Sequence, residues 1–136
     1  MRIAVGADDQ HELVRTVLAW GRDHGHDVTL VADARPWPEA GRLVGEAVAS
    51  GSADRGVVLC WTGTGVSIAA NKVSGVRAAL CADAETARGA RRWNDANVLA
   101  LSMRATTPAV ATEILDAFIG TDEVDPDELG NIAALD

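Results

Sequence analysis

Short runs of aliphatic residues alternate with longer amphipathic stretches along the whole chain. The aliphatic runs are nearly continuous, which is typical of strands buried on both faces of a parallel sheet, and they cover residues 2–7, 27–32, 55–60, 75–81 and 96–101. The amphipathic stretches predict helices at residues 11–25, 38–51, in the segment after residue 65, at 84–93 and at 107–120. This alternation predicts an α/β fold, a three-layer α/β/α sandwich built on a five-stranded parallel sheet.

Local signals set several of the expected boundaries. Gly25 follows the first predicted helix as a stop signal, Pro108 suits the first turn of the last helix, and Gly120 ends that helix. Residues 33–38, with the sequence DARPWP, are expected to form a stiff, proline-rich loop.

The length and charge of the chain limit what the protein can be. Its 136 residues suffice for one domain, placed at residues 1–120, with an acidic C-terminal tail at 121–136 that has little apolar surface to bury. The net charge of −8 and the scattered basic residues argue against nucleic acid or an anionic membrane as a partner. No apolar run approaches the roughly 20 residues that span a bilayer, and a signal-peptide pattern is lacking.

The two cysteines, Cys60 and Cys81, have neither CxxC spacing nor a neighbouring histidine in the sequence. The sequence therefore predicts no disulfide scaffold and no metal site, and a reduced, cytoplasmic protein. A cysteine at a strand end is commonly a small buried hydrophobe. We prefer that interpretation for Cys81, whereas Cys60 stays open.

Ligands of open parallel sheets bind outside the carboxyl ends of the strands. This rule selects five groups of residues: Asp8 and Asp9, Trp37, residues 60–65, residues 81–83 and residues 102–104. Most of the other polar residues belong to exposed helix faces.

The loop after the third strand, in VVLCWTGTGV, carries the strongest chemical signal. Gly63 and Gly65 allow a sharp turn whose backbone N–H groups converge at the start of the next helix. Such a turn stabilises an oxyanion, and the positive end of the helix favours a thiolate at Cys60, which could serve as a general base or a nucleophile. The turn is weak evidence for nucleotide binding, because Ile68 replaces the third glycine of GxGxxG and no GK[ST] follows.

Three segments resemble the ribose-5-phosphate isomerase B family, which includes the galactose-6-phosphate isomerase subunits. CWTGTGVSIAANKVSGVRAAL is similar to the family signature CGTGxGxSIAANKxxGIRAA, AVGADD to its first strand and Asp-His loop, and RRWNDANVLALSMR to its RxHNxxNVLxxGxR segment. The resemblance implies a divergent aldose–ketose isomerase with a doubly wound, Rossmann-like fold. It further implies a small-molecule substrate, a sugar or sugar phosphate, no metal or organic cofactor, and a homodimer or tetramer whose active sites take residues from both subunits.

The resemblance also implies roles for the residues of the glycine turn. Cys60 would be the base that moves a proton between C1 and C2 through a cis-enediolate, and Thr62 would contact the sugar. The backbone N–H groups of Gly63, Thr64 and Gly65 would form the oxyanion hole, which is often the largest catalytic contribution.

Other matched positions would bind the substrate, and some depart from the family pattern. Asp8 would bind hydroxyls or assist ring opening, Asn94 would contact the sugar, and Arg104 would help to hold a phosphate. Trp93 stands where the family has its ring-opening histidine and cannot relay a proton, while Asp9 replaces a histidine and would repel a phosphate. No Arg or Lys follows Arg104, so the family's paired tail arginines are absent, and each lost charge-assisted hydrogen bond costs roughly 1.5–3 kcal/mol.

Trp37, Trp61 and Trp93 fall at predicted pocket positions where the family typically has Tyr, Gly and His. Their rings could stack on sugar faces or bind an aromatic or apolar ligand, so a remodelled pocket is expected. Trp20, on the first helix, is interpreted as core. His11 is the only histidine near the candidate site and is either a substitute acid or merely exposed.

Three hypotheses follow. The first is an isomerase or epimerase that uses Cys60 for proton transfer next to a carbonyl. The second keeps this scaffold in specialised metabolism, with a tryptophan-lined pocket for a larger or unphosphorylated substrate. The third is a catalytically silent binding module. The retained cysteine, threonine and glycines favour the first two, and the missing histidine and arginines favour the last two.

Overall fold

A computed structural model describes all residues, 1–136. The strands are β1 (Arg2–Ala7), β2 (Asp27–Ala32), β3 (Arg55–Cys60), β4 (Ala78–Leu80) and β5 (Val98–Ser102). The helices are α1 (Glu12–Asp23), α2 (Trp37–Ala49), α3 (Thr64–Asn71), α4 (Ala84–Asn94), α5 (Pro108–Gly120), the short 3₁₀ turn η1 (Pro126–Glu128) and α6 (Leu129–Ala133).

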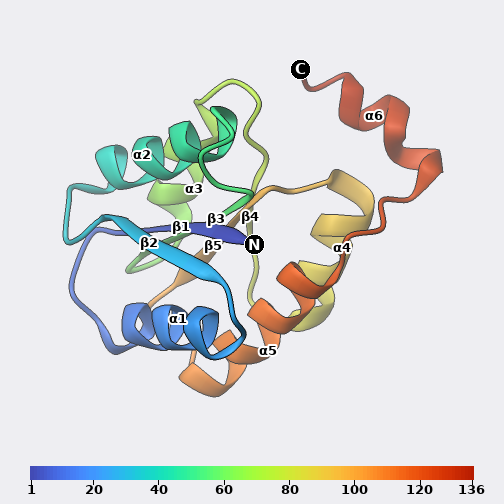
Figure 1. Cartoon of the computed structure of the whole chain (residues 1–136). Coiled ribbons are helices and arrows are strands. Elements are labelled where there is room, and N and C mark those ends of the chain that lie inside the picture. Colours follow the sequence, from blue (N-terminus) through green and yellow to red (C-terminus); the bar gives the residue numbers. More distant parts are fainter.

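The five strands form one parallel sheet in the order β2-β1-β3-β5-β4. Helices α2 and α3 cover one face of the sheet, and α1, α4 and α5 cover the other (Figure 1). This arrangement confirms the predicted three-layer α/β/α sandwich. The strand order reverses between β1 and β3, and in doubly wound folds this reversal leaves a crevice at the carboxyl ends of the strands.

Two apolar cores explain why the strands are nearly continuous aliphatic runs. A cluster of 22 buried residues fills the face under α1, α4 and α5. A second cluster of 12 lies under α2 and α3. Alternate residues of a strand point to opposite faces of the sheet, and each face is covered by an apolar core. The side chains on both faces of β1, β3 and β5 are therefore largely apolar.

Most boundary signals act as the sequence predicts. Gly25 has φ +76° directly after the end of α1, and Pro108 and Gly120 are the first and last residues of α5. One prediction is wrong in part: Trp37 and Pro38 do not belong to the 33–38 loop, because they form the first turn of α2, where proline loses no helical hydrogen bond.

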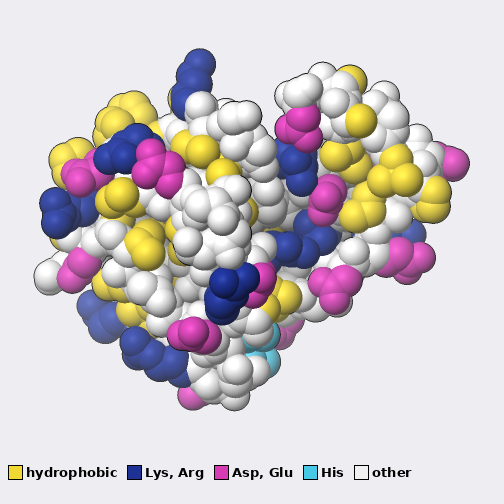
Figure 2. All heavy atoms as spheres, turned by 45° about the horizontal axis from the view of Figure 1, so that its top comes forward, with side chains coloured by type: hydrophobic (Ala, Val, Ile, Leu, Met, Phe, Trp, Pro, Cys, Tyr) yellow, Lys and Arg dark blue, Asp and Glu magenta, His cyan; other side chains and the backbone are white.

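The last 16 residues, 121–136, leave the body of the molecule as an arm that contains η1 and α6 (Figure 1). Figure 2 shows apolar and acidic side chains exposed together on this arm. The backbone N–H of Asp125 donates to the carbonyl of Arg92 at 2.8 Å, and the Asp136 carboxylate lies 3.6 Å from the Arg77 guanidinium. These contacts fasten the arm to the body at two places. None of the helices combines the length and the apolar content that crossing a bilayer requires.

Candidate active site

A surface pocket of about 420 Å³ opens at the carboxyl ends of β1 and β3. Residues from the end of β3, from the loops after β1 and β3, from the start of α2 and from α3 line it: Asp8, Trp37, Cys60, Trp61, Thr62, Thr64, Gly65 and Ile68. Seven of these eight residues, all but Ile68, were predicted from the sequence as candidate site residues. The pocket therefore lies where the strand-end rule places a ligand.

The thiol of Cys60 lies at the base of the pocket and is held by the glycine turn. The backbone N–H of Gly63 donates a hydrogen bond to the Cys60 Sγ over 3.2 Å. Gly63 has φ +78°, and a Cβ at this position would lie 2.5 Å from Leu80 Cδ1 and 3.0 Å from the Leu101 carbonyl carbon. Only glycine fits this turn, and the turn directs a hydrogen-bond donor at the sulfur, where it stabilises negative charge.

Helix α3 starts directly after this turn. No side chain caps its first residues, so the partial positive charge at the helix start faces the pocket without a capping side chain in between. The hydroxyls of Thr62 and Thr64 lie 2.8 Å apart and share one hydrogen bond. Two hydroxyls and a free helix start suit a polar oxygen-rich ligand beside the thiol.

Two tryptophan rings form the walls of the pocket. The indole of Trp37 lies on the backbone of Gly65, where a Cβ would come within 2.9 Å of the ring. Trp37 is 45% exposed and Trp61 is 58% exposed, so both rings have a free face. Such faces are suited to stacking on the C–H face of a sugar or on an apolar group.

The backbone that carries Cys60 and Trp61 is fixed by the loop after β5. The N–H of Met103 donates to the Cys60 carbonyl, and that of Arg104 donates to the Trp61 carbonyl, each at 2.9 Å. The Ser102 hydroxyl donates to the same Trp61 carbonyl at 3.0 Å. This clamp leaves the start of the glycine turn little freedom to move.

Two neighbouring carboxylates follow β1, but only one reaches the pocket. Asp8 lines the pocket, and partial burial together with the nearby Asp9 charge raises its pKa. The Asp9 carboxylate instead accepts a hydrogen bond from the N–H of Gln10 at 2.8 Å, within its own turn. The pocket lining contains no Lys or Arg, so its one ionisable carboxylate makes it unfavourable for a phosphate.

Besides Asp9, four predicted substrate residues lie outside this pocket within one chain. Trp93 and Asn94 line a separate pocket of about 420 Å³ together with Leu80, the residue that contacts the Gly63 turn. His11 is the N-cap of α1, and its Nδ1 accepts the Leu13 N–H at 3.0 Å. The side chain of Arg104 is exposed and lines none of the larger pockets.

The sequence reasoning missed Ile68 and Leu80 as site residues. Ile68 follows Thr64 by four positions on α3, so both point to the same side of the helix, and this spacing could have revealed it. The contact of Leu80 with Gly63 joins β4 to the loop after β3, and no local pattern in the sequence signals it. Cys81 is 1% exposed, and burial raises its pKa to about 11, which agrees with a structural role.

The largest hollow, about 500 Å³, lies between residues 71–79 and the end of the C-terminal arm. No group of three or more His, Cys, Asp or Glu side chains is arranged to hold a metal ion.

The fold and the pocket define a small doubly wound α/β protein with a thiol, a glycine turn and indole rings at the strand ends. The chain matches the Ribose/Galactose Isomerase family over residues 3–132. It belongs to that family. The match includes most of the acidic tail, beyond the three segments whose motifs resemble the family.

Curated relatives agree with this membership. Ribose-5-phosphate isomerase B of Escherichia coli is 36% identical over 124 residues, which are 88% of this chain and 83% of that protein. D-erythrulose-4-phosphate isomerase of Pectobacterium atrosepticum is 36% identical over 125 residues, 88% of this chain and 82% of that protein. Galactose-6-phosphate isomerase subunit LacB of Clostridium acetobutylicum is 48% identical over 83 residues, 61% of this chain and 48% of that protein.

Solved structures show the same fold. The ribose-5-phosphate isomerase B of Clostridium thermocellum superposes with a TM-score of 0.93 at 35% identity, covering 99% of this chain and 95% of that one. The corresponding protein of Thermotoga maritima gives 0.92 at 33% identity, with 99% and 97% coverage. The family is one of isomerases, and its fold is retained here over the whole chain.

Proposed function

We propose that the protein is an aldose–ketose isomerase of the ribose-5-phosphate isomerase B type that acts on a sugar or sugar phosphate. The observation that carries the proposal is the Cys60 thiol in a pocket, with the Gly63 N–H directed at its sulfur. Membership in the Ribose/Galactose Isomerase family supports it.

Cys60 is the base in this proposal. Its thiolate removes the proton from C2 of the open-chain aldose, which leaves a neutral thiol and an enediolate. The thiol then returns the proton to C1 while O2 becomes the ketose carbonyl oxygen, and the hydroxyl proton moves from O2 to O1. A positioned base of this kind contributes roughly 10²–10⁴-fold.

The enediolate oxygen lies against the backbone N–H groups of the glycine turn, residues 63–65. Fixed donors stabilise charge that develops in the transition state without reorganisation. Thr62 and Asp8 bind sugar hydroxyls from the two sides of the pocket, and the raised pKa of Asp8 makes it a better proton donor for ring opening than an ordinary carboxyl.

The active form is a homodimer in this proposal. Trp93 and Asn94 lie in a separate pocket of the same chain, and exposed apolar side chains border both pockets: Trp61, Leu80 and Trp93. A second copy that places its Trp93 and Asn94 over the Cys60 pocket buries these side chains and adds the missing sugar contacts. Burial of such exposed apolar surface is a driving force for association.

A second candidate is an isomerase for a larger or unphosphorylated sugar. The observation that favours it is the pocket lining, which has two indole rings and an acidic side chain but no cation. A phosphate placed there has no Lys or Arg partner in the pocket lining, whereas an apolar substituent gains contact with the rings.

The proposal is tested by proton exchange in D₂O, followed by NMR at C1 and C2 of ribose 5-phosphate, galactose 6-phosphate, erythrulose 4-phosphate and unphosphorylated ribose. We expect exchange with at least one sugar, its loss in Cys60→Ser and its retention in the matched variant Cys81→Ala. Unchanged exchange in Cys60→Ser removes Cys60 as the base. Exchange with ribose alone among the four sugars favours the second candidate, and sugar binding without exchange supports a silent binding module.

A further inference from the structure

The chain reverses direction at Asp95, directly after the predicted sugar residues Trp93 and Asn94. Asp95 follows the last residue of α4 with φ +47° and ψ +44°, a left-handed conformation. Its N–H donates to the Arg91 carbonyl at 3.1 Å, and that of Ala96 donates to the Ala90 carbonyl at 3.0 Å. Helices commonly end in this way with glycine, while a residue with a Cβ needs support from its surroundings.

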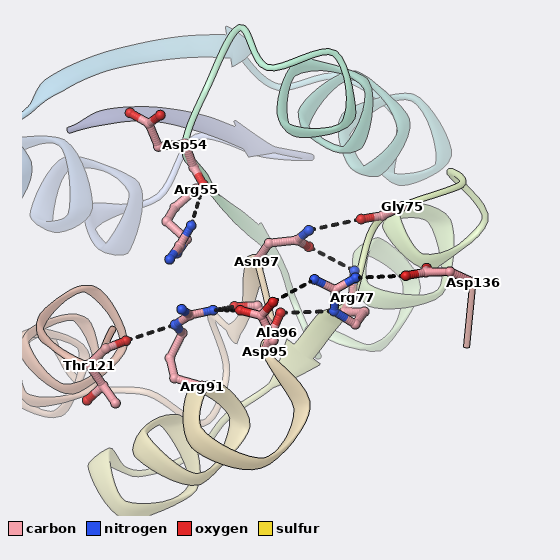
Figure 3. Close-up of polar contacts among 10 residues, drawn as sticks. All are labelled: Asp54, Arg55, Gly75, Arg77, Arg91, Asp95, Ala96, Asn97, Thr121 and Asp136. Carbon is pink, nitrogen blue, oxygen red and sulfur yellow. Dashed lines mark hydrogen bonds and ion pairs between the residues drawn. The ribbon is translucent and has the colours of Figure 1, made fainter. Parts of the chain in front are cut away.

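Arg91 supplies part of that support. It is 2% exposed, and its Nη1 donates to Asp95 Oδ1 at 2.8 Å and to the Ala96 carbonyl at 2.6 Å. Its Nε donates to the Thr121 carbonyl at 2.9 Å. A buried guanidinium therefore joins the end of α4 to the chain that leaves α5 (Figure 3).

Arg77, from the segment before β4, holds Asp95 from the other side (Figure 3). Its Nη2 donates to Asp95 Oδ2 at 3.2 Å, and its Nε donates to the Asp95 carbonyl at 3.0 Å. The two carboxylate oxygens of Asp95 thus each receive a different arginine. Arg77 and Arg91 are largely shielded from water in these ion pairs, so loss of the Asp95 charge leaves two poorly solvated guanidinium groups without their partner.

Asn97 completes the arrangement. Its side-chain oxygen accepts the Arg77 N–H at 2.8 Å, and its amide donates to the Gly75 carbonyl at 2.9 Å. Arg77, Arg91 and Asn97 belong to the GVRAAL and RRWNDANVL segments, yet none of them reaches the Cys60 pocket. These three motif residues, which have no place in that pocket, therefore meet around Asp95.

We infer that Asp95 is a positioning residue, an inference that rests on the proposed function. Asp95 is bridged by Arg77 and Arg91 and thereby holds the left-handed end of α4. This end in turn presents Trp93 and Asn94 to the substrate. The two presented side chains are exposed, and the backbone that carries them ends at the braced turn. The charge of Asp95 sets their position, although Asp95 itself contacts no substrate.

The decisive variant is Asp95→Asn, because asparagine tolerates a left-handed conformation and keeps the side-chain shape while it removes the negative charge. Asp122→Asn is the matched control, since it removes one exposed carboxylate from the same region. Asp122 lies outside the brace, which consists of Asp95 together with Arg77 and Arg91. Circular dichroism and the thermal midpoint report whether each variant is folded.

The first readout is a double-mutant cycle with Asn94→Ala, measured as kcat and KM for the sugar that wild type converts best. We expect Asp95→Asn to lower kcat/KM by about ten- to a hundredfold and to cause a clearly smaller loss in the Asn94→Ala background, where Trp93 alone is left to be positioned. Losses that multiply independently overturn the inference, because a merely structural role does not depend on Asn94.

The second readout needs no activity. In Asp95→Asn, we expect the Trp93 indole N–H and Asn94 side-chain amide resonances to shift or broaden, and the Asp95 and Ala96 amides to exchange with solvent at least about tenfold faster. Amides of α1 serve as the reference and stay unchanged, as does the whole spectrum near α4 in Asp122→Asn. Unaltered resonances overturn the inference even in an active enzyme. Altered resonances in a protein that converts no sugar support the brace and reject the proposed function instead.

Discussion

The indole of Trp93 lies against the backbone of Gly89, one helical turn before it, so closely that a Cβ at position 89 would fall 2.6 Å from the ring. Trp37 meets Gly65 in the same way. Each of these two tryptophans therefore has a glycine beneath it. These contacts fix the position of the Trp37 ring in the Cys60 pocket and that of the Trp93 ring in the separate pocket beside Leu80.

The contact between Gly89 and the Trp93 ring predicts that the effect of Gly89→Ala on the unfolding free energy changes sign when the ring is removed. A glycine inside a helix costs about 1 kcal/mol relative to alanine, so Gly89→Ala gains this amount only where the ring is absent. We expect Gly89→Ala to lower the unfolding free energy in wild type and to raise it by up to about 1 kcal/mol in a Trp93→Ala background. Urea unfolding of the four proteins measures both changes, and equal effects in the two backgrounds contradict the contact.

Replacing Trp93 by histidine is also predicted to change the rate of sugar isomerisation. Under the proposed isomerase function, Trp93→His restores a group that transfers protons during ring opening, and turnover of ribose 5-phosphate rises by up to roughly 10²-fold. Trp93→Phe is the control, because it removes the indole without adding a proton carrier. An equal rise in both variants attributes the gain to space in the pocket. No rise in either variant leaves the missing tail arginines, or a different substrate, as the explanation.

Much of the fold could be predicted because burial on two faces leaves a simple pattern. The aliphatic runs that became β1, β3 and β5 are continuous, and Gly25, Pro108 and Gly120 act locally. The error at residues 33–38 has a physical reason: Pro38 follows Trp37 at the start of α2, where proline fits the first turn of a helix as well as it fits a loop.

The site was predictable only as far as strand ends determine it. Asp8, Trp37 and residues 60–65 come together because parallel strands deliver their loops to one edge of the sheet. Trp93 and Asn94 were selected by their motif, and a motif specifies residue types without specifying which pocket of the chain they line. Contacts between distant segments, such as Leu80 with Gly63, leave no local pattern at all.

The raised pKa of Asp8 predicts that removing its charge stabilises the fold at neutral pH but not at acidic pH. Burial and the Asp9 charge raise its folded-state pKa above the ordinary 3.8, so the folded state is favoured when Asp8 is protonated. This stability is fully present below pH 3.8 and is lost as the pH rises through the folded-state pKa. Asp8→Asn is therefore expected to raise the thermal midpoint at pH 7 and to leave it unchanged near pH 3. Asp33→Asn, at an exposed carboxylate, is the control, and the same rise at both pH values contradicts the argument.

Gly63 gives the sharpest prediction, because its conformation and its surroundings both exclude a side chain. Gly63→Ala is expected to lose roughly 1–3 kcal/mol for the left-handed backbone, plus the cost of moving Leu80 and the Leu101 carbonyl apart. Gly51→Ala is the matched control, since Gly51 has φ +82° but a Cβ there would meet no other atom within 4 Å. The difference in unfolding free energy between these two variants therefore measures the crowding alone. Because the Gly63 N–H is directed at the Cys60 sulfur, proton exchange is expected to fall in Gly63→Ala and to persist in Gly51→Ala. A folded Gly63→Ala protein with full exchange activity shows that the turn has no part in the chemistry.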